Sequence, residues 1–209
     1  MKVLIADDHE IVRRGLREIL ADEFTGLEVY EARDGHEALA AVREQDIDVV
    51  LLDINMPGRG GLGVLEELKE IRPKLPVVIV SAFPEEDYAL RAFKLGALGY
   101  VSKGGAPEEL LTAIRKALAG GRYLTTALAE RLAGLLAGEP HSAPHELLSN
   151  RELQVLRMIA LGKTVKEVAG ELALSEKTIA TYRARISEKM HLSTNVELAR
   201  YAMQHKLVD

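Results

Sequence analysis

The chain has 209 residues, no cysteine and a formal net charge of −5 at pH 7. This length suits one large domain or two modest ones, each able to bury a core. The lack of cysteine excludes disulfides, thiol catalysis and Cys-based zinc sites, and no apolar run approaches the ~20 residues that a membrane helix needs. Asp7 and Asp8 interrupt the apolar start too early for a signal peptide, so we expect a cytoplasmic protein with no membrane partner.

Charge is unevenly distributed along the chain. Residues 1–147 hold 17 Lys and Arg against 25 Asp and Glu, a net charge of −8, whereas residues 148–209 hold 10 against 7, a net charge of +3. A mildly basic C-terminal part on an acidic protein suggests a separate anion-binding function. Two ordinary domains that differ by chance are the alternative, and the charge alone does not decide between them.

Short apolar runs alternate with amphipathic stretches over the first ~120 residues. The amphipathic stretches have helical periodicity, as in Ile11, Leu16, Ile19 and Leu20. Alternation of this kind predicts an α/β fold with five βα units and a doubly wound parallel sheet. The expected strands are residues 3–6, 27–32, 49–52, 76–80 and 98–101.

Polar side chains follow four of these strands directly. Asp7 and Asp8 come after the first strand, Asp53 after the third, Ser81 after the fourth and Lys103 after the fifth. Asp53 therefore lies at the carboxyl end of a buried strand, where open α/β sheets place their ligands. Three acids at the ends of two neighbouring strands form a hard oxygen site suited to Mg²⁺.

A change of pattern follows residue 120. Residues 122–137 read as a short Ala/Leu-rich helix, and residues 138–145 have two prolines, a glycine and no apolar periodicity, which indicates a linker. We therefore expect a linker over residues 121–147 and a second domain over residues 148–209.

The C-terminal part predicts four helices with clear start signals. Ser149 and Glu152 form a capping box ahead of the first helix, and Thr164 and Glu167 form another ahead of the second. Ser175 can cap a third helix that runs to about residue 190, and a last helix spans about 196–205. Two short helices joined by a tight turn inside a small all-α unit predict a helix-turn-helix.

The N-terminal pattern resembles the receiver domain of two-component response regulators, a flavodoxin-like fold. The order acid-acid, acid, hydroxyl, lysine at successive strand ends carries the resemblance over residues 1–120. The motif D-x-x-M-P-x-x-x-G is also met, at Asp53, Met56, Pro57 and Gly61.

The C-terminal pattern resembles the LuxR-type output domain over residues 148–209. The segments that carry it are Leu148-Ser-Asn-Arg-Glu152, Gly162-Lys-Thr164, Lys166-Glu-Val-Ala169 and Lys177-Thr-Ile179. Together the two parts resemble a response regulator of the NarL/FixJ class, and Thr181-Tyr-Arg-Ala-Arg-Ile186 is most similar to the Gac-type regulators.

The receiver resemblance implies a role for each strand-end residue. Asp53 would accept a phosphoryl group from a sensor histidine kinase, Lys103 and Ser81 would contact its oxygens, and Tyr100 would switch rotamer. The implied Mg²⁺ ligands are Asp8, Asp53 and the Asn55 carbonyl, with Asp7 acting through a water. The implied consequence is that phosphorylation draws Ser81 and Tyr100 inward and releases or dimerises the output domain.

The output resemblance implies that the third C-terminal helix enters double-stranded promoter DNA. With Ile179 at the centre of the packed side, helical geometry places Lys177, Thr181 and Ala184 outward, where small residues allow close approach to bases. The candidate DNA contacts are Lys177, Thr178, Ala180, Thr181, Ala184, Arg185 and, ranked lower, Arg183. RNA polymerase is a further expected partner.

The last helix is apolar over more than one face, which predicts either a homodimer seam or packing against the receiver or the linker helix. The apolar residues are Val196, Leu198, Ala199, Tyr201, Ala202 and Met203. Two other classes of function remain as alternatives: a phosphoaspartate enzyme with Asp53 as turnover nucleophile, and a DNA binder independent of phosphorylation. Asn55 stands where such enzymes usually carry a second acid, and the full acidic set argues against the second alternative.

Overall fold

The computed structural model describes residues 1–58, 60–136, 143–205 and 207–208. The chain separates into two compact units, Met1–Ala137 and Gly138–Asp209, and each is described by itself. Of the expected linker segment 138–145, residues 138–142 lie outside the described residues.

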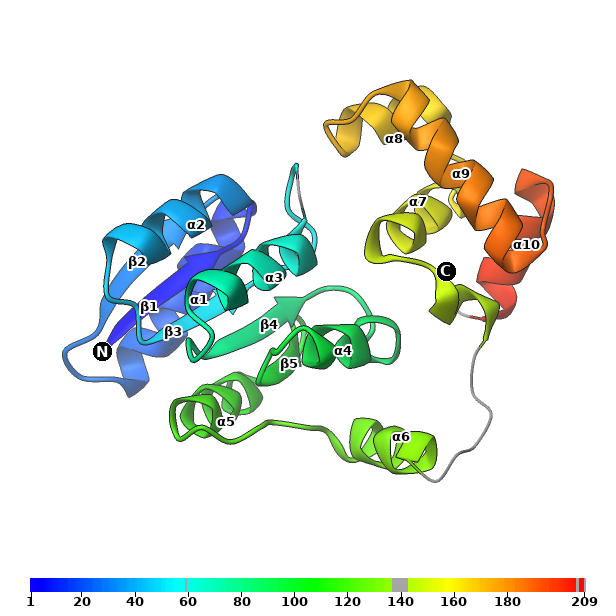
Figure 1. Cartoon of the computed structure of the whole chain (residues 1–209). Coiled ribbons are helices and arrows are strands. Elements are labelled where there is room, and N and C mark those ends of the chain that lie inside the picture. Colours follow the sequence, from blue (N-terminus) through cyan, green and yellow to red (C-terminus); the bar gives the residue numbers. More distant parts are fainter. Residues whose placement is uncertain (59, 137–142, 206, 209) are drawn as a thin grey trace. The chain divides into compact units, whose positions relative to one another are not determined.

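The N-terminal unit contains the predicted five-stranded parallel sheet, with the order β2-β1-β3-β4-β5 (Figure 1). The strands are β1 (Lys2–Ala6), β2 (Glu28–Ala32), β3 (Val49–Leu52), β4 (Val77–Ser81) and β5 (Gly99–Ser102). Their bounds agree with the apolar runs to within one residue, because β1, β3 and β4 are buried on both faces and permit almost no polar side chain.

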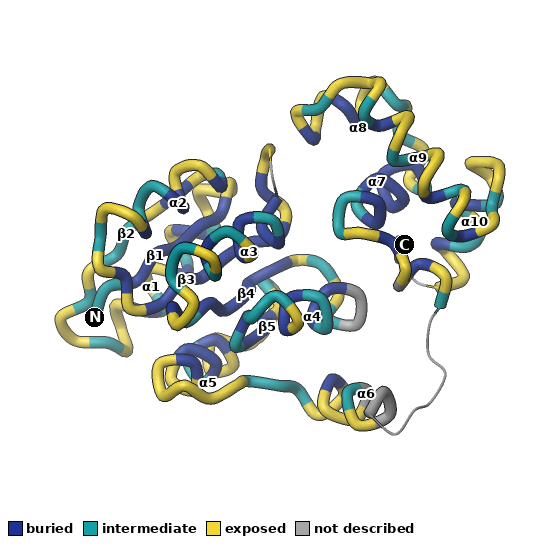
Figure 2. The backbone as a smooth tube through the Cα atoms, viewed as in Figure 1, coloured by how far each residue is buried: buried dark blue, intermediate teal, exposed yellow. Residues whose placement is uncertain are grey.

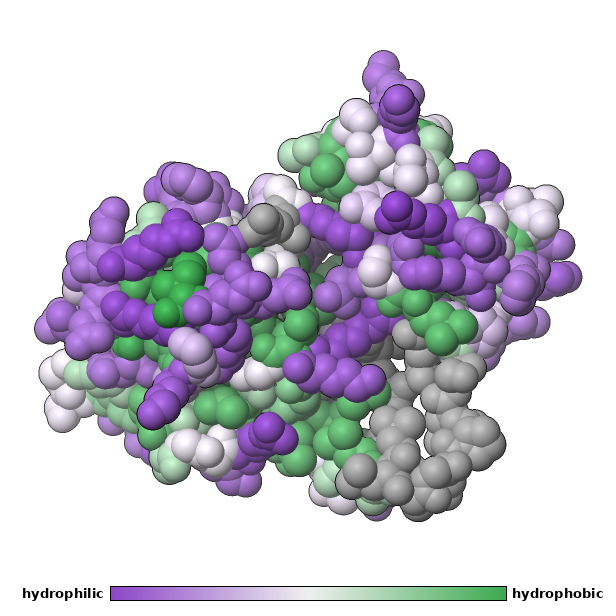
Figure 3. Space-filling view, viewed as in Figure 1, coloured by the Kyte–Doolittle hydropathy of each residue, from purple (hydrophilic) through white to green (hydrophobic). Residues whose placement is uncertain are grey.

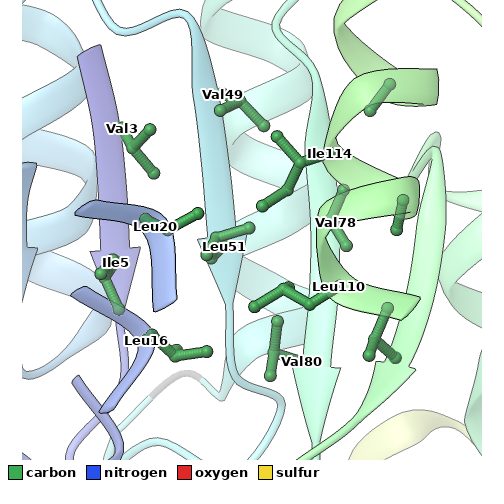
Figure 4. Close-up of a cluster of buried hydrophobic side chains, with 13 residues drawn as sticks. Val3, Ile5, Leu16, Leu20, Val49, Leu51, Val78, Val80, Leu110 and Ile114 are labelled. Carbon is green, nitrogen blue, oxygen red and sulfur yellow. The ribbon is translucent and has the colours of Figure 1, made fainter. Parts of the chain in front are cut away.

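Five helices flank the sheet. They are α1 (Glu10–Glu23), α2 (Gly35–Glu44), α3 (Gly61–Ile71), α4 (Glu85–Lys94) and α5 (Pro107–Leu118). Helices α1 and α5 cover one face, where their leucines interdigitate with alternate strand residues (Figure 4). The labelled core residues there are Val3, Ile5, Leu16, Leu20, Val49, Leu51, Val78, Val80, Leu110 and Ile114. The alternate strand residues Leu4, Leu52 and Ile79 are buried as well, so the sheet is covered on both faces.

Helix α1 differs from its predicted apolar face at one position. Ile11 is 87 % exposed, whereas Arg13 is buried. Arg13 donates from Nη1 to the Asp7 carbonyl at 2.8 Å and from Nε to Glu31 at 2.9 Å, so its charge is compensated inside the fold. Periodicity alone assigned Ile11 inward because it does not anticipate a paired arginine that takes the inward position.

The helix expected in the linker is α6 (Thr126–Leu136), and it packs against α4 in the N-terminal unit. The segment before it is also attached there, because Tyr123 N donates to the Leu98 carbonyl and Thr125 Oγ1 donates to Glu85 at 2.7 Å. A short 3₁₀ helix, η1 (Pro144–Leu147), packs instead on α9 of the C-terminal unit. Both ends of the expected linker thus belong to the units that flank it.

The C-terminal unit is a four-helix bundle with the predicted caps. Its helices are α7 (Asn150–Ala160), α8 (Val165–Glu171), α9 (Glu176–Met190) and α10 (Asn195–Gln204). The capping boxes at Ser149 and Thr164 are confirmed, and Ser175 caps α9 by accepting from Thr178 N. A third capping box, formed by Thr194 and Glu197, precedes α10, which begins at Asn195, one residue before the predicted start at 196.

Helices α8 and α9 form the predicted helix-turn-helix. The turn between them passes through Ala173, whose φ of 52° is unusual for a residue with a side chain. The packed side of α9 is buried as expected (Figure 2), with Ile179, Ile186 and Met190 as its core residues.

Within the described ranges, no helix is both long and apolar enough to span a bilayer. On the face drawn in Figure 3, hydrophilic residues surround smaller apolar areas in both units.

Candidate phosphoryl site and nucleic-acid interface

The acidic residues meet at the carboxyl edge of the sheet. Strand β1 pairs with β2 on one side and β3 on the other, so the chain reverses its winding direction between β1 and β3, and Asp7 and Asp53 follow these two strands. Ligand atoms of Asp7, Asp8, His9 and Asp53 all lie within 4.8 Å of one another. The structure therefore brings together the three acids that the sequence places at strand ends.

Lys103 is the counter-charge of this cluster. Its Nζ lies 2.7 Å from Asp7 Oδ2 and 2.8 Å from Asp53 Oδ2. Burial by itself would lower the pKa of Lys103, but its hydrogen bonds to Asp53 and Asp7 and their charges outweigh burial and raise it. Lys103 is therefore a fixed cation at the ends of two strands.

The surroundings of Asp53 disfavour its ionised form. The residue is 1 % exposed, and burial raises the pKa of its carboxyl against the lowering effects of Lys103 and of a backbone hydrogen bond from Asn55. Its Oδ1 is buried and has no hydrogen-bond partner among the described residues. An unpaired buried carboxylate oxygen beside other acids fits a divalent cation, whose charge would offset the desolvation.

Asp7 and Asp8 differ in availability. Asp7 is 1 % exposed, and both its oxygens are engaged, Oδ1 by His9 N at 2.9 Å and Oδ2 by Lys103. Asp8 is exposed, and its Oδ1 lies 2.8 Å from His9 Nδ1. Asp8 thus offers an exposed carboxylate and Asp53 a buried oxygen without a partner among the described residues, whereas Asp7 is better placed to orient Lys103.

The loop after Asp53 depends on a close backbone approach. Gly61 N donates to the Ile54 carbonyl at 2.8 Å, and a Cβ on Gly61 would lie only 1.8 Å from the Asp53 carbonyl oxygen. Any side chain at Gly61 would therefore displace the backbone of Asp53. This explains why the motif that begins at Asp53 needs glycine at this position.

Ser81 and Tyr100 are both connected to Phe83. Ser81 Oγ accepts from Phe83 N at 3.1 Å, and the Tyr100 hydroxyl donates to the Phe83 carbonyl at 2.8 Å. Tyr100 is only 2 % exposed, so its ring is already inward in this structure. Phosphorylation can draw Tyr100 inward, as expected from the sequence, only from another receiver state in which the ring points outward.

The candidate DNA contacts lie where helical geometry placed them. Lys177, Ala180, Thr181, Ala184 and Arg185 are all exposed on α9. An open hollow of about 300 Å³ runs along one flank of this helix. Its walls are formed by Ser175, Lys177, Thr178, Thr181, Tyr182 and Arg185.

Two side chains on α9 are already engaged within the unit. Arg183 is half-buried and donates from Nε to Asn195 Oδ1 at 2.9 Å, which supports its lower rank as a DNA contact. Thr181 Oγ1 donates to the Lys177 carbonyl at 3.0 Å, a bond typical of threonine in helices. The hydroxyl hydrogen of Thr181 is thus directed into the helix.

The apolar surplus of α10 is smaller than its sequence suggests. Leu198 and Ala202 are buried within the unit, and Tyr201 forms a 2.9 Å hydrogen bond with His145. Val196 and Met203 remain exposed, at 77 % and 61 %. The homodimer seam predicted on this helix therefore reduces to a few side chains.

Three contributors to the acidic site were missed by the sequence reasoning. His9 joins the cluster, Arg13 holds the Asp7 carbonyl, and the Phe83 backbone connects Ser81 with Tyr100. The run Asp7-Asp8-His9 was a signal for the first, since histidine is a common metal ligand. Backbone partners such as Phe83 leave no signal in the sequence.

The fold and the two sites define a receiver domain joined to a helix-turn-helix output domain. The sequence profile of the response regulator receiver domain matches residues 3–115, and that of the bacterial regulatory proteins of the luxR family matches residues 146–202. The chain belongs to the response regulators and is a DNA-binding two-component regulator with a LuxR-type output domain.

Individual relatives match over the whole length. The response regulator GacA of Pseudomonas aeruginosa is 42 % identical and covers 100 % of this chain and 98 % of its own. The response regulator UvrY of Escherichia coli K12 is 37 % identical and covers 99 % of this chain and 95 % of its own. The prediction of a Gac-type regulator is thus confirmed at the level of similarity.

Solved structures show the same two-domain architecture. RcsB from Salmonella enterica serovar Typhimurium, bound to promoter rprA in the presence of the phosphomimetic BeF₃⁻, has a TM-score of 0.67 at 27 % identity. That alignment covers 97 % of this chain and 98 % of RcsB.

Proposed function

We propose that Asp53 is the phospho-acceptor of this regulator and that a sensor histidine kinase is the donor. The observation that carries the proposal is the buried Asp53 carboxylate, which has one unpaired oxygen beside two further acids and one oxygen on Lys103. Phosphoryl transfer to a carboxylate requires an in-line nucleophile, a cation and a counter-charge for the equatorial oxygens.

The chain's own residues divide these tasks. Asp8 and Asp53, with the Asn55 carbonyl, would hold Mg²⁺, and Asp7 would take part through a water; the ion would supply positive charge that offsets that of the transferring group. Lys103 exchanges its contact with Asp53 Oδ2 for a phosphoryl oxygen while Asp7 keeps it in place. Ser81 accepts from Phe83 N, so its own hydroxyl hydrogen is available to a second phosphoryl oxygen.

A regulator rather than a turnover enzyme fits this arrangement. Asn55 occupies the position where phosphoaspartate enzymes usually place a second acid, and an amide cannot act as a general acid or base. Phosphorylation then changes the balance between two receiver states only by stabilising one more than the other, with Tyr100 as the switch residue.

For the output unit, we infer that α9 enters the major groove of promoter DNA. Exposed Thr181, Ala180 and Ala184 face bases, while Lys177 and Arg185 anchor phosphates. In this proposal residues 1–120 are the receiver, residues 148–209 bind DNA and residues 121–147 join the two, with α6 and η1 packed on the units that flank this segment. A homodimer on paired half-sites, contact with RNA polymerase and a cytoplasmic location complete the proposal.

Direct phosphorylation tests the receiver half. With Mg²⁺ and acetyl phosphate, intact-mass measurement should show one added phosphoryl group on the parent and on the matched variant Asp22→Asn, whose carboxylate is exposed on α1. Asp53→Asn should show none. Undiminished labelling of Asp53→Asn would remove the proposal.

A randomised-site selection tests the output half. Thr181→Ala should relax preference at one base position, at a cost of roughly 1–3 kcal/mol against the preferred base. Because the Thr181 hydroxyl bonds the helix backbone, its methyl group faces outward, so Thr181→Val should keep the preference. Lys177→Ala should weaken binding to all DNA sequences alike and reduce the slope of affinity against salt concentration by about one ion. An unchanged preference for Thr181→Ala at full affinity would contradict this orientation of α9.

A further inference from the structure

The hollow on α9 is built on one flank of the helix. Four of its wall residues, Thr178, Thr181, Tyr182 and Arg185, follow the i, i+3, i+4, i+7 spacing of a single stripe. At 100° per residue, this stripe lies to one side of the direction opposite Ile179, whereas Ala180 and Ala184 lie to the other. The outward face of α9 is therefore asymmetric, with a flat alanine flank and a hollowed polar flank.

The chemistry of the hollow favours an anion. Lys177 and Arg185 contribute two positive charges, and the described residues that line it include no carboxylate. The hydroxyls of Ser175 and Thr178 bond each other at 2.8 Å, and Ser175 Oγ caps Thr178 N, so they form a fixed polar floor. The hollow has a volume of about 300 Å³ and is open to solvent, so a group larger than a small free ion can enter it.

Tyr182 is the aromatic wall of this hollow. The structure shows it half-buried with its side chain lining the opening. Its half-buried ring lies on the same helix stripe as Thr178 and Arg185. A half-buried tyrosine presents a phenolic donor with little conformational freedom to lose on binding.

We propose that the hollow seats a backbone phosphodiester of one DNA strand and that Tyr182 donates its hydroxyl to that phosphate. The proposal rests on the DNA-binding function of the output domain. With α9 in the major groove, its two flanks face the two walls of the groove. The hollow anchors one wall, Ala180 and Ala184 on the other flank can approach bases, and Thr181 lies between the two, nearly opposite Ile179. Tyr182 is thereby a register-setting residue that reads no base itself.

Tyr182→Phe in the full-length protein isolates the hydroxyl, because the ring that packs in the unit is kept. The probe is the DNA fragment that the parent selects from a randomised library, with affinity measured across a salt series. Affinity should fall about tenfold, as for loss of one hydrogen bond to a charged group. The slope against salt should stay unchanged because no charge is removed, whereas Arg185→Ala should flatten it by about one ion.

Tyr30→Phe is the matched control, since it removes a hydroxyl that bonds Gln45 in the receiver unit. It should bind DNA like the parent. Parent-like affinity of Tyr182→Phe would overturn the proposal, and so would an altered base preference, which would mean that the hollow receives a base. If the parent itself shows no salt-dependent binding to any fragment, both the DNA-binding function and the proposal for Tyr182 are contradicted.

Discussion

Replacing Asp53 by asparagine should stabilise the receiver unit in the absence of Mg²⁺. The carboxyl is 1 % exposed, and burial raises its pKa in spite of Lys103, so the fold disfavours the ionised form of Asp53. The asparagine side chain would keep the shape without the charge, and Lys103 would keep its 2.7 Å contact with Asp7. Functional residues commonly reduce stability in this way.

The expected gain is about 1 kcal/mol, the size of a typical stabilising substitution. For a unit of this length, that corresponds to a rise of roughly 3–6 °C in Tm. The gain should depend on pH with a definite sign. Since the folded pKa of Asp53 lies above its unfolded value, the penalty on the parent is complete above the folded pKa and disappears as the carboxyl is protonated. The difference between variant and parent should therefore close on acidification.

Calorimetric melting in EDTA at several pH values would measure this difference, with Asp22→Asn as an exposed control expected to change stability by less than ~0.5 kcal/mol. Added Mg²⁺ at tenfold excess over Kd should stabilise the parent by about 1.4 kcal/mol and so raise its Tm. The Tm of Asp53→Asn should rise much less. A variant less stable than the parent in EDTA at neutral pH would refute the reasoning.

Two further predictions concern backbone space and acid sensitivity. Gly61→Ala should destabilise by roughly 3 kcal/mol or more and abolish phosphorylation by acetyl phosphate, because its Cβ would lie 1.8 Å from the Asp53 carbonyl oxygen. Gly15→Ala in α1, with open space around its Cβ, should instead stabilise by ~0.5–1 kcal/mol in the same melts. In the output unit, burial of Glu152 opposes ionisation, but Lys189 at 2.6 Å and the Ser149 cap outweigh it and lower the pKa. The stabilisation by Glu152 is thus present above its unfolded pKa and lost as pH falls through the folded pKa. Glu152→Gln should cost about 1.5–3 kcal/mol at pH 7 and progressively less toward acid pH, and an equal cost at both ends would contradict the ion-pair account.

The strands and the acidic cluster could be predicted because their signals are local. A strand that is apolar on both faces must lie in the centre of the sheet, covered by helices on each side. A polar residue directly after such a strand therefore lies at the carboxyl end of the sheet. Asp7, Asp53 and Lys103 meet for this reason alone. The start of α10 could also have been predicted, since Thr194 and Glu197 repeat the pattern seen at the other two capping boxes.

The remainder depends on partners distant in the chain. Burial of Arg13 depends on Glu31 and on a backbone carbonyl, and neither contact follows from helical periodicity. The inward ring of Tyr100 depends on a carbonyl in the loop after β4. Tyr182 lies at the border of the packed face, and a residue there can line a hollow as readily as fill a core.

The three capping boxes also bear on how the chain acquires its structure. Each box involves residues only three apart, so α7, α8 and α10 have their start sites specified before any tertiary contact forms. The sheet, with its order β2-β1-β3-β4-β5, cannot close its centre until β1 has met a strand more than 40 residues later. Local contacts favour fast folding, and non-local parallel pairing is slow. When the whole chain refolds from denaturant, the output unit should therefore reach its native state before the receiver, so DNA binding should return before phosphorylation does.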